Sequence, residues 1–207
     1  LGLLKMDFLG LRTLTVIQNA VLLARRKQPE LNINQIDYND QKVLDYIGTG
    51  KTDGVFQLES AGMKGFMKEL KPHNLEDVIA GISLYRPGPM DFIPQYIRGK
   101  NDSSSITYDC PQLEPILAPT YGCIVYQEQV MQIVRDLAGY SLGRSDLLRR
   151  AMSKKKAAVM EKERKIFIYG DEETGVPGCI KNGIDEQTAN KIYDEMIDFA
   201  KYAFNKS

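Results

Sequence analysis

Apolar residues recur at helical spacing through most of this 207-residue chain, and that pattern limits the fold more than any other feature. Between residues 11 and 27 the apolar side chains, among them Leu14, Ile17 and Val21, lie three or four positions apart. Alternation of apolar and polar residues, the pattern of a strand, marks Leu4 to Leu9. We therefore expect a mainly α-helical protein with one short β segment near residue 5.

The same spacing, together with capping residues and helix breakers, predicts where the helices begin and end. The expected N-terminal caps are Ser60, Asn74, Ser145 and Asp185. Pro87 and Pro89 end one helix abruptly. The predicted helices cover residues 11–27, 41–47, 61–70, 75–84, 91–97, 127–137, 146–152, 157–168 and 186–199.

Charge and cysteine content exclude several classes of protein. Lys plus Arg and Asp plus Glu both total 27, so a uniformly basic coat for nucleic acid is excluded, although a local basic patch is not. No apolar run approaches the roughly 18 residues of a membrane span. Cys110, Cys123 and Cys179 are far apart and form no C-x-x-C pair, which argues against a disulfide framework or a zinc site. We expect a cytoplasmic protein.

The strongest local charge lies between residues 144 and 156. Six residues there are basic and only Asp146 is acidic; the basic ones are Arg144, Arg149, Arg150, Lys154, Lys155 and Lys156. On a helix Arg150 and Lys154 share a face, and such groups hold phosphate oxygens. The alternative is a solvated helix end with Asp146 and Arg150 as a minor surface pair.

Two weaker features also suit anions or cations. Lys5 and Asp7, on one face of the expected strand, could hold a phosphate and a divalent cation, but Asp7 could equally cap the next helix or pair with Lys5. Arg86 precedes a proline and is therefore held in extended backbone, as anion binding would require, although the turn could be a plain helix terminator.

Other chemistries have little support in the sequence. The only histidine, His73, has no nucleophile motif near it and is interpreted as a surface residue. Lys51 and Thr52 follow two glycines, but without the spacing of a phosphate-binding P-loop. The aromatic residues between 121 and 126 are interpreted as core.

Seven short motifs follow one another along the chain. They are K-M-D-F-L-G-L at 5–11, G-V-F-Q-L-E-S at 54–60, R-P-G-P at 86–89, P-T-Y-G at 119–122, Y-Q-E-Q-V-M at 126–131, L-R-R-A-M-S-K-K at 148–155 and F-N-K-S at 204–207. In the same order they resemble motifs of the bacterial replicative DNA polymerases of the C family, the DNA polymerase III alpha subunits. The chain begins at Leu1 and stops directly after an aromatic stretch, so we expect a piece of a longer protein.

The resemblance implies an architecture and a metal ligand. Residues 1–10 would be the last strand of the family's palm, and residues 11–207 most of its multi-helix fingers domain. Of the three metal-binding aspartates in that palm, one maps onto Asp7, and the D-x-D pair that supplies the other two is absent. The resemblance therefore implies two Mg²⁺ ions in the parent polymerase and an isolated chain that is inactive.

The resemblance also implies which residues bind the substrate. The residues expected at the triphosphate of the incoming deoxynucleotide are Lys5, Arg86, Arg149, Arg150, Lys154 and Lys155. Those expected at the pocket for the nascent base pair are Tyr202, Asn205 and Lys206. The implied partners are primer–template DNA, deoxynucleoside triphosphates, and the sliding clamp and other holoenzyme subunits through parts outside this chain, with no membrane partner.

Two other hypotheses remain open on the sequence. In one, the folded chain is a binding module for triphosphate or template DNA through residues 144–156, with an affinity that falls steeply with salt. In the other it is only a helical scaffold that pairs through exposed apolar residues at 1–4.

Overall fold

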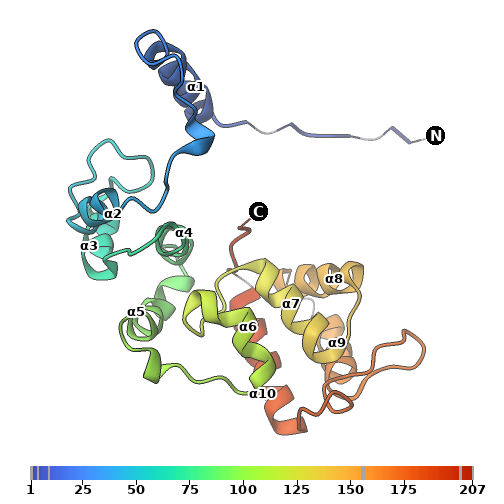
Figure 1. Ribbon diagram of the computed structural model, residues 1–207. Helices are drawn as coiled ribbons and strands as arrows, with labels where there is room; N and C mark the ends of the chain where they lie inside the picture. Colours follow the sequence, from blue (N-terminus) through green and yellow to red (C-terminus); the bar gives the residue numbers. More distant parts are fainter. Residues whose placement is uncertain (1, 4, 9, 155–156, 201, 207) are drawn as a thin grey trace. The chain divides into compact units, whose positions relative to one another are not determined.

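The chain forms two compact units, residues 1–38 and 39–207, which are described separately (Figure 1). The computed structural model describes residues 2–3, 5–8, 10–154, 157–200 and 202–206. Leu1 and Leu4, half of the apolar stretch expected to pair in the scaffold hypothesis, lie outside the described residues.

The described residues of the first unit form one α-helix, α1 (Arg12–Ala24), and a 3-10 turn, η1 (Ile33–Gln35). The helix lies where the apolar spacing predicted it but ends three residues earlier than residue 27. The side chain of Arg25 turns back, and its Nε donates to the carbonyl of Leu31 at 2.8 Å. No residue of α1 is buried.

The strand expected at the start of the chain is not formed by the residues described there. Residues 5–8 have no regular secondary structure, and their side chains are exposed. Alternation alone does not make a strand, because its backbone groups need a neighbouring strand to bond. The described residues of the first unit include no such neighbour.

The second unit confirms the mainly helical fold. Its α-helices are α2 (Gln41–Gly48), α3 (Ala61–Leu70), α4 (Leu75–Leu84), α5 (Ile93–Asn101), α6 (Glu114–Leu117), α7 (Gln127–Ala138), α8 (Leu142–Ser153), α9 (Ala157–Tyr169) and α10 (Glu186–Ala200). Among the described residues, β pairing is limited to two single-residue bridges. The prediction missed the short α6, and it began α5 two residues too early and ended it four residues too early.

Three of the four expected N-terminal caps are confirmed, and one is wrong. Ser60, Asn74 and Asp185 each accept a backbone N–H from the residue three positions on, at 2.8–3.2 Å. Helix α8, however, is capped by Ser141, whose Oγ accepts from the backbone N–H of Arg144 at 3.3 Å. Ser145 lies inside the helix, where its buried hydroxyl donates to the Leu142 carbonyl and cannot act as a cap.

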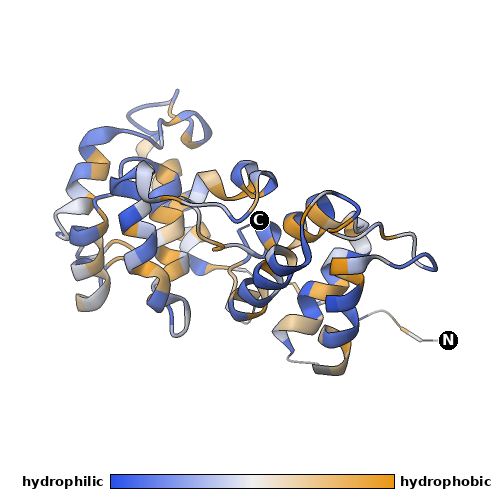
Figure 2. Cartoon of the chain, turned by 90° about the horizontal axis from the view of Figure 1, so that it is seen from below, coloured by the Kyte–Doolittle hydropathy of each residue, from blue (hydrophilic) through white to orange (hydrophobic). Residues whose placement is uncertain are grey.

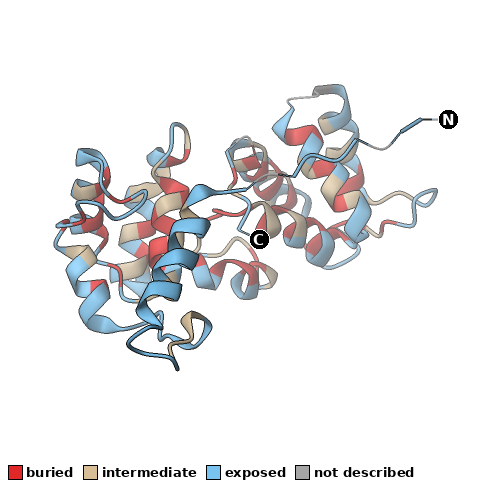
Figure 3. Ribbon diagram, turned by 90° about the horizontal axis from the view of Figure 1, so that it is seen from above, coloured by how far each residue is buried: buried red, intermediate tan, exposed pale blue. Residues whose placement is uncertain are grey.

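Two apolar cores hold the second unit together. One lies among α6 to α10, where the rings of Phe167 and Tyr193 are 5.4 Å apart. The other joins α2 to α5 with residues 123–126, and includes Met67 and Tyr96, both fully buried. Apolar residues lie on the facing sides of these helices (Figure 2), and the same sides are the buried ones (Figure 3). Burying a side chain of this size stabilises the fold by about 1.5–3 kcal/mol.

A buried charge pair lies beside the second core. The side chains of Asp77 on α4 and Lys100 on α5 are each 1% exposed, and their charged atoms are 3.7 Å apart. The carboxylate of Asp77 also accepts from the hydroxyls of Tyr96 and Tyr121, at 3.2 and 3.1 Å, and from the backbone N–H of His73 at 2.8 Å. Burial lowers the pKa of Lys100. Asp77 thus connects α4, α5 and the segment around residue 121.

The three cysteines are free thiols buried in the two cores. Burial raises the pKa of Cys123 and of Cys179 to about 12, from 9.0. We expect neither thiol to react with iodoacetamide at pH 8 while the chain is folded, because the reagent cannot reach the buried sulfur atoms and the thiols stay protonated. Mass spectrometry measures the labelling. Protein unfolded in urea is the control, and it should gain three carbamidomethyl groups, one at each cysteine. Rapid labelling of the native chain would contradict it.

The same thiols make the fold sensitive to alkali. Above pH 9 the unfolded chain loses these protons while the folded chain keeps them, so the folded state binds more protons. The free energy of unfolding should therefore fall as the pH rises from 9 towards 12, which a urea titration at several pH values measures.

Across the part of the chain that the structure describes, no helix is both long and apolar enough to span a bilayer.

Candidate functional site

A pocket of about 550 Å³ in the second unit collects residues from four of the motifs found in the sequence. We call it the arginine pocket. Its walls are Arg86, Pro87 and Pro89 from the turn after α4, Gln127 from α7, Arg149 and Ser153 from α8, and Ala200 with residues 202–205 after α10. Four of the expected substrate-binding residues, Arg86, Arg149, Tyr202 and Asn205, therefore lie at one site.

Arg149 is held in the pocket wall by two neighbours. Its Nε and Nη2 donate to one carboxylate oxygen of Asp146, at 3.2 and 2.6 Å. Its Nη1 donates to the side-chain oxygen of Gln127 at 2.8 Å. Three of its five N–H donors are thus engaged, and two remain for a ligand. With a side chain only 17% exposed, Arg149 is an oriented cation in a sheltered position.

Arg86 lines the arginine pocket from the R-P-G-P motif, in the turn after α4. Its guanidinium lies over the ring of Phe204, 5.5 Å from the centroid, in a cation–π arrangement. Two residues on, Gly88 has φ +104, and a Cβ there would come within 2.6 Å of the ring of Tyr202. Glycine at 88 is therefore required both by the backbone and by this packing.

The segment after α10 is docked on α7 by main-chain hydrogen bonds. The N–H of Phe204 donates to the carbonyl of Val125 at 3.1 Å, and the N–H of Gln127 donates to the carbonyl of Phe204 at 2.9 Å. These two bonds form a parallel bridge between Tyr126 and Phe204. The bridge places Tyr202 and Asn205 in the pocket wall.

Asp146 balances the charge at this end of α8. Its second carboxylate oxygen lies 2.7 Å from Nε of Arg150, whose side chain is 62% exposed and does not line the pocket. Hydrogen bonding from Arg149 holds the pKa of Asp146 below its usual value. Lys154 is exposed at the end of α8, and Lys155 lies outside the described residues.

Two other cations singled out in the sequence lie elsewhere. Arg144 points to α9, where its Nη2 is 3.0 Å from Glu163 and its guanidinium lies over the ring of Tyr140. Lys206 contacts Glu76 and lies over the ring of Tyr126, and its backbone N–H donates to Glu128 at 3.1 Å. Neither residue lines the arginine pocket.

Lys5 and Asp7 lie in the first unit. Their charged atoms are 3.8 Å apart, and the two side chains are 86% and 72% exposed. Among the described residues, no three His, Cys, Asp or Glu side chains gather in an arrangement suited to a metal ion. Asp7 supplies one oxygen-donor group of the kind that hard divalent cations prefer, but one carboxylate alone does not form a metal site.

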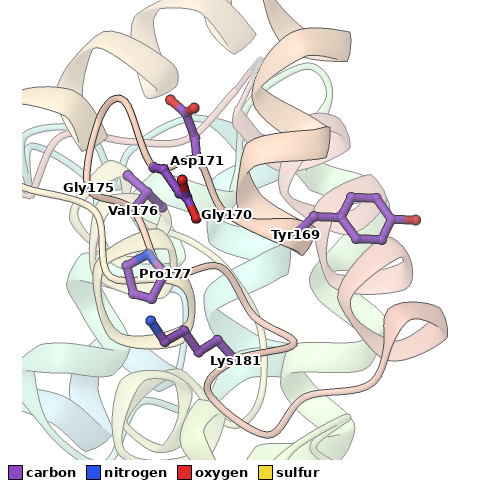
Figure 4. Close-up of a pocket in the computed structure, with 8 residues that line it drawn as sticks. Tyr169, Gly170, Asp171, Gly175, Val176, Pro177 and Lys181 are labelled. Carbon is purple, nitrogen blue, oxygen red and sulfur yellow. The ribbon is translucent and has the colours of Figure 1, made fainter.

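A second pocket, of about 460 Å³, lies under the loop between α9 and α10 (Figure 4). Asp171 and Val176 exchange backbone hydrogen bonds across this loop, at 2.8 and 3.0 Å. The ring of Tyr169 points away from the loop (Figure 4). The residues that line this pocket include two carboxylates, Asp171 and Glu172, and one cation, Lys181. This charge is unsuited to an anionic ligand, so the arginine pocket is the stronger candidate.

The sequence motifs did not reveal the role of Gln127 or Phe204. Both belong to motifs that were noticed, but an uncharged amide and a phenyl ring carry no chemical signature of their own. Their part in the site depends on contacts between residues far apart in the sequence, such as the bond from Gln127 to Ala203 across 76 residues, which only the fold supplies.

Comparison with known proteins gives one consistent result. Residues 13–175 match the family described as the bacterial DNA polymerase III alpha subunit finger domain. The whole chain is 50% identical to part of the DNA polymerase III subunit alpha of Halalkalibacterium halodurans, and 49% and 47% identical to those of Thermus aquaticus and Bacillus subtilis. It spans 17–18% of the length of these relatives.

Proposed function

The chain belongs to the finger-domain family of bacterial DNA polymerase III alpha subunits, and from that membership we propose that its arginine pocket binds the triphosphate of an incoming deoxynucleotide. The complete subunit would carry out template-directed DNA synthesis by nucleotidyl transfer on primer–template DNA. As a part of a bacterial replicative polymerase, the chain would act in the cytoplasm.

One observation carries the proposal. Arg86 and Arg149 come from different elements, yet both line one pocket, and no carboxylate is among the residues that line it. Arginine forks match phosphate oxygens in geometry and charge. Tyr202 and Asn205 line the same pocket and would face the base and sugar. Arg150, Lys154 and Lys155 would add positive charge at the end of α8.

The contribution of these residues to the reaction is position and charge. Phosphoryl transfer needs the reacting oxygens held in line and the developing charge neutralised, rather than covalent help from the protein. Because Asp146 and Gln127 already fix the orientation of Arg149, its positive charge would stabilise the triphosphate without a large reorganisation when the nucleotide binds.

Lys5 and Asp7 are assigned by the family motif alone. We propose Lys5 near the triphosphate and Asp7 as one ligand of two Mg²⁺ ions, whose other ligands come from outside this chain. Bound Mg²⁺ would neutralise phosphate charge and activate the attacking oxygen. We also propose that residues 1–10 belong to the palm and that Lys206 contributes to the nascent base-pair pocket.

The dependence of binding on phosphate number tests the proposal. In a full-length alpha subunit containing this chain, on a primer–template, a deoxynucleoside triphosphate should bind roughly 10- to 100-fold more tightly than the diphosphate, because charge-assisted hydrogen bonds are lost. The difference should shrink as salt rises. Lys181→Ala is the control, because Lys181 lines the pocket at the loop between α9 and α10; this variant should show the same difference in affinity as the unmodified subunit. Equal affinities for triphosphate and diphosphate would refute the site.

A further inference from the structure

Gln127 lies between Arg149 in the wall of the arginine pocket and the backbone of the segment after α10. Its side-chain oxygen accepts from Nη1 of Arg149 at 2.8 Å, and its Nε2 donates to the carbonyl of Ala203 at 3.0 Å. Its backbone N–H donates to the carbonyl of Phe204 at 2.9 Å. One residue therefore makes three hydrogen bonds that join α8 to residues 203–204.

The chemistry of the two partners fixes the orientation of this amide. A guanidinium only donates and a carbonyl only accepts, so the amide oxygen must face Arg149 and the amide nitrogen must face Ala203. Among the common side chains of this length, glutamine alone satisfies both. Glutamate would still accept from Arg149, but its carboxylate would repel the Ala203 carbonyl. Methionine would make neither bond.

From this geometry we propose that Gln127 is a positioning residue that couples the docking of residues 203–206 to the orientation of Arg149. With the segment docked, the amide is held by Ala203 and presents its oxygen to the arginine. With the segment released, the amide of Gln127 rotates freely and no longer holds Arg149. The guanidinium of Arg149 then keeps its hydrogen bonds to Asp146, which lies on the same helix, α8. The consequence for nucleotide affinity rests on the proposed function, whereas the coupling itself does not.

Coupling of this kind is reciprocal, so it can be measured either at Arg149 or at the docked residues 203–206. If docking of the segment orients Arg149, then removal of the Arg149 side chain must loosen the segment. The backbone N–H groups of Phe204 and Lys206 report on that docking, because they donate to Val125 and Glu128.

Hydrogen exchange in the full-length subunit tests the coupling without any substrate. Gln127→Met and Arg149→Met should both raise the exchange rates of the amides of Phe204 and Lys206, by about tenfold. Gln132→Met is the matched control on α7, because Gln132 is exposed and its side chain donates to Asp136 on the same helix. Arg150→Met is the matched control on α8 for exchange, because Arg150 shares Asp146 but does not reach Gln127. Unchanged exchange in Arg149→Met would overturn the coupling.

Steady-state kinetics then distinguish the proposed coupling from a simpler role, in which Gln127 only accepts a hydrogen bond from Arg149. Gln127→Met and Gln127→Glu should both raise the KM for the deoxynucleotide by roughly 10-fold with a smaller change in kcat, because both lose the bond to Ala203. Gln132→Met should leave both constants unchanged. A wild-type KM in Gln127→Glu would overturn the inference, since holding Arg149 would then need no docked segment.

The two readouts distinguish failure of this inference from failure of the proposed function. If the arginine pocket does not bind the triphosphate, Arg149→Met leaves KM unchanged while the exchange of Phe204 still responds. If Gln127 has no coupling role, Arg149→Met raises KM while the exchange of Phe204 does not respond.

Discussion

Replacing Asp77 by alanine should lower the free energy of unfolding by about 3–5 kcal/mol, the cost of leaving one partner of a buried ion pair without the other. The ammonium of Lys100 would remain in a position where its side chain is 1% exposed. The hydroxyls of Tyr96 and Tyr121 would lose their acceptor as well. Urea unfolding followed by circular dichroism measures the change.

Two further variants show whether the effect comes from the unpaired charge. Asp136→Asn, at an exposed acidic position on α7, should change stability by no more than about 0.5 kcal/mol. The double variant Asp77→Ala/Lys100→Met should recover part of the loss, because it removes both charges together. A double variant no more stable than Asp77→Ala would show that the lost tyrosine contacts, which both variants share, outweigh the unpaired charge of Lys100.

Removing both arginines of the L-R-R motif should lower kcat/KM for deoxynucleotide incorporation by about 100- to 1000-fold in a full-length subunit. Hydrogen bonds to charged groups contribute about 1.5–3 kcal/mol each, and 1.4 kcal/mol corresponds to tenfold. Most of the loss should come from Arg149, which lines the pocket, and less from Arg150, which is 62% exposed. Primer extension by Arg149→Ala, Arg150→Ala and the double variant measures each share.

The control for this series is Arg135→Ala, an exposed arginine on α7 that does not line the arginine pocket. Its kcat/KM should equal that of the unmodified subunit. If Arg150→Ala costs as much as Arg149→Ala, then the nucleotide draws Arg150 away from Asp146 on binding, and the site is larger than the unliganded pocket. An unchanged kcat/KM in the double variant would refute the assignment.

The helices could be predicted from sequence because their signals are local. A polar cap such as Ser60, an apolar face and a terminating glycine or proline all lie within one helix. The error at α8 has the same origin, since Ser141 and Ser145 are both capable caps and only packing selects between them. The strand expected from Leu4 to Leu9 is not formed by the described residues 5–8, because strand pairing is not local.

The site was predictable only in part, for a similar reason. Charge marked residues 144–156 as one cluster, but Arg144 and Arg149 are five positions apart, about 140° around a helix axis. One therefore faces Glu163 on α9 and the other faces the pocket. Gln127 could not be recognised at all, because its role depends on a segment far along the chain.

The docked segment also sets the order in which a newly synthesised chain acquires its pocket. Synthesis proceeds from the N-terminus, and contacts distant in sequence form late. Ala203 bonds to Gln127 across 76 residues, and it follows Ala200, the last residue of the core among α6 to α10. A nascent chain on the ribosome can therefore close the core among α6 to α10 before its arginine pocket is complete, and it acquires the capacity to bind last.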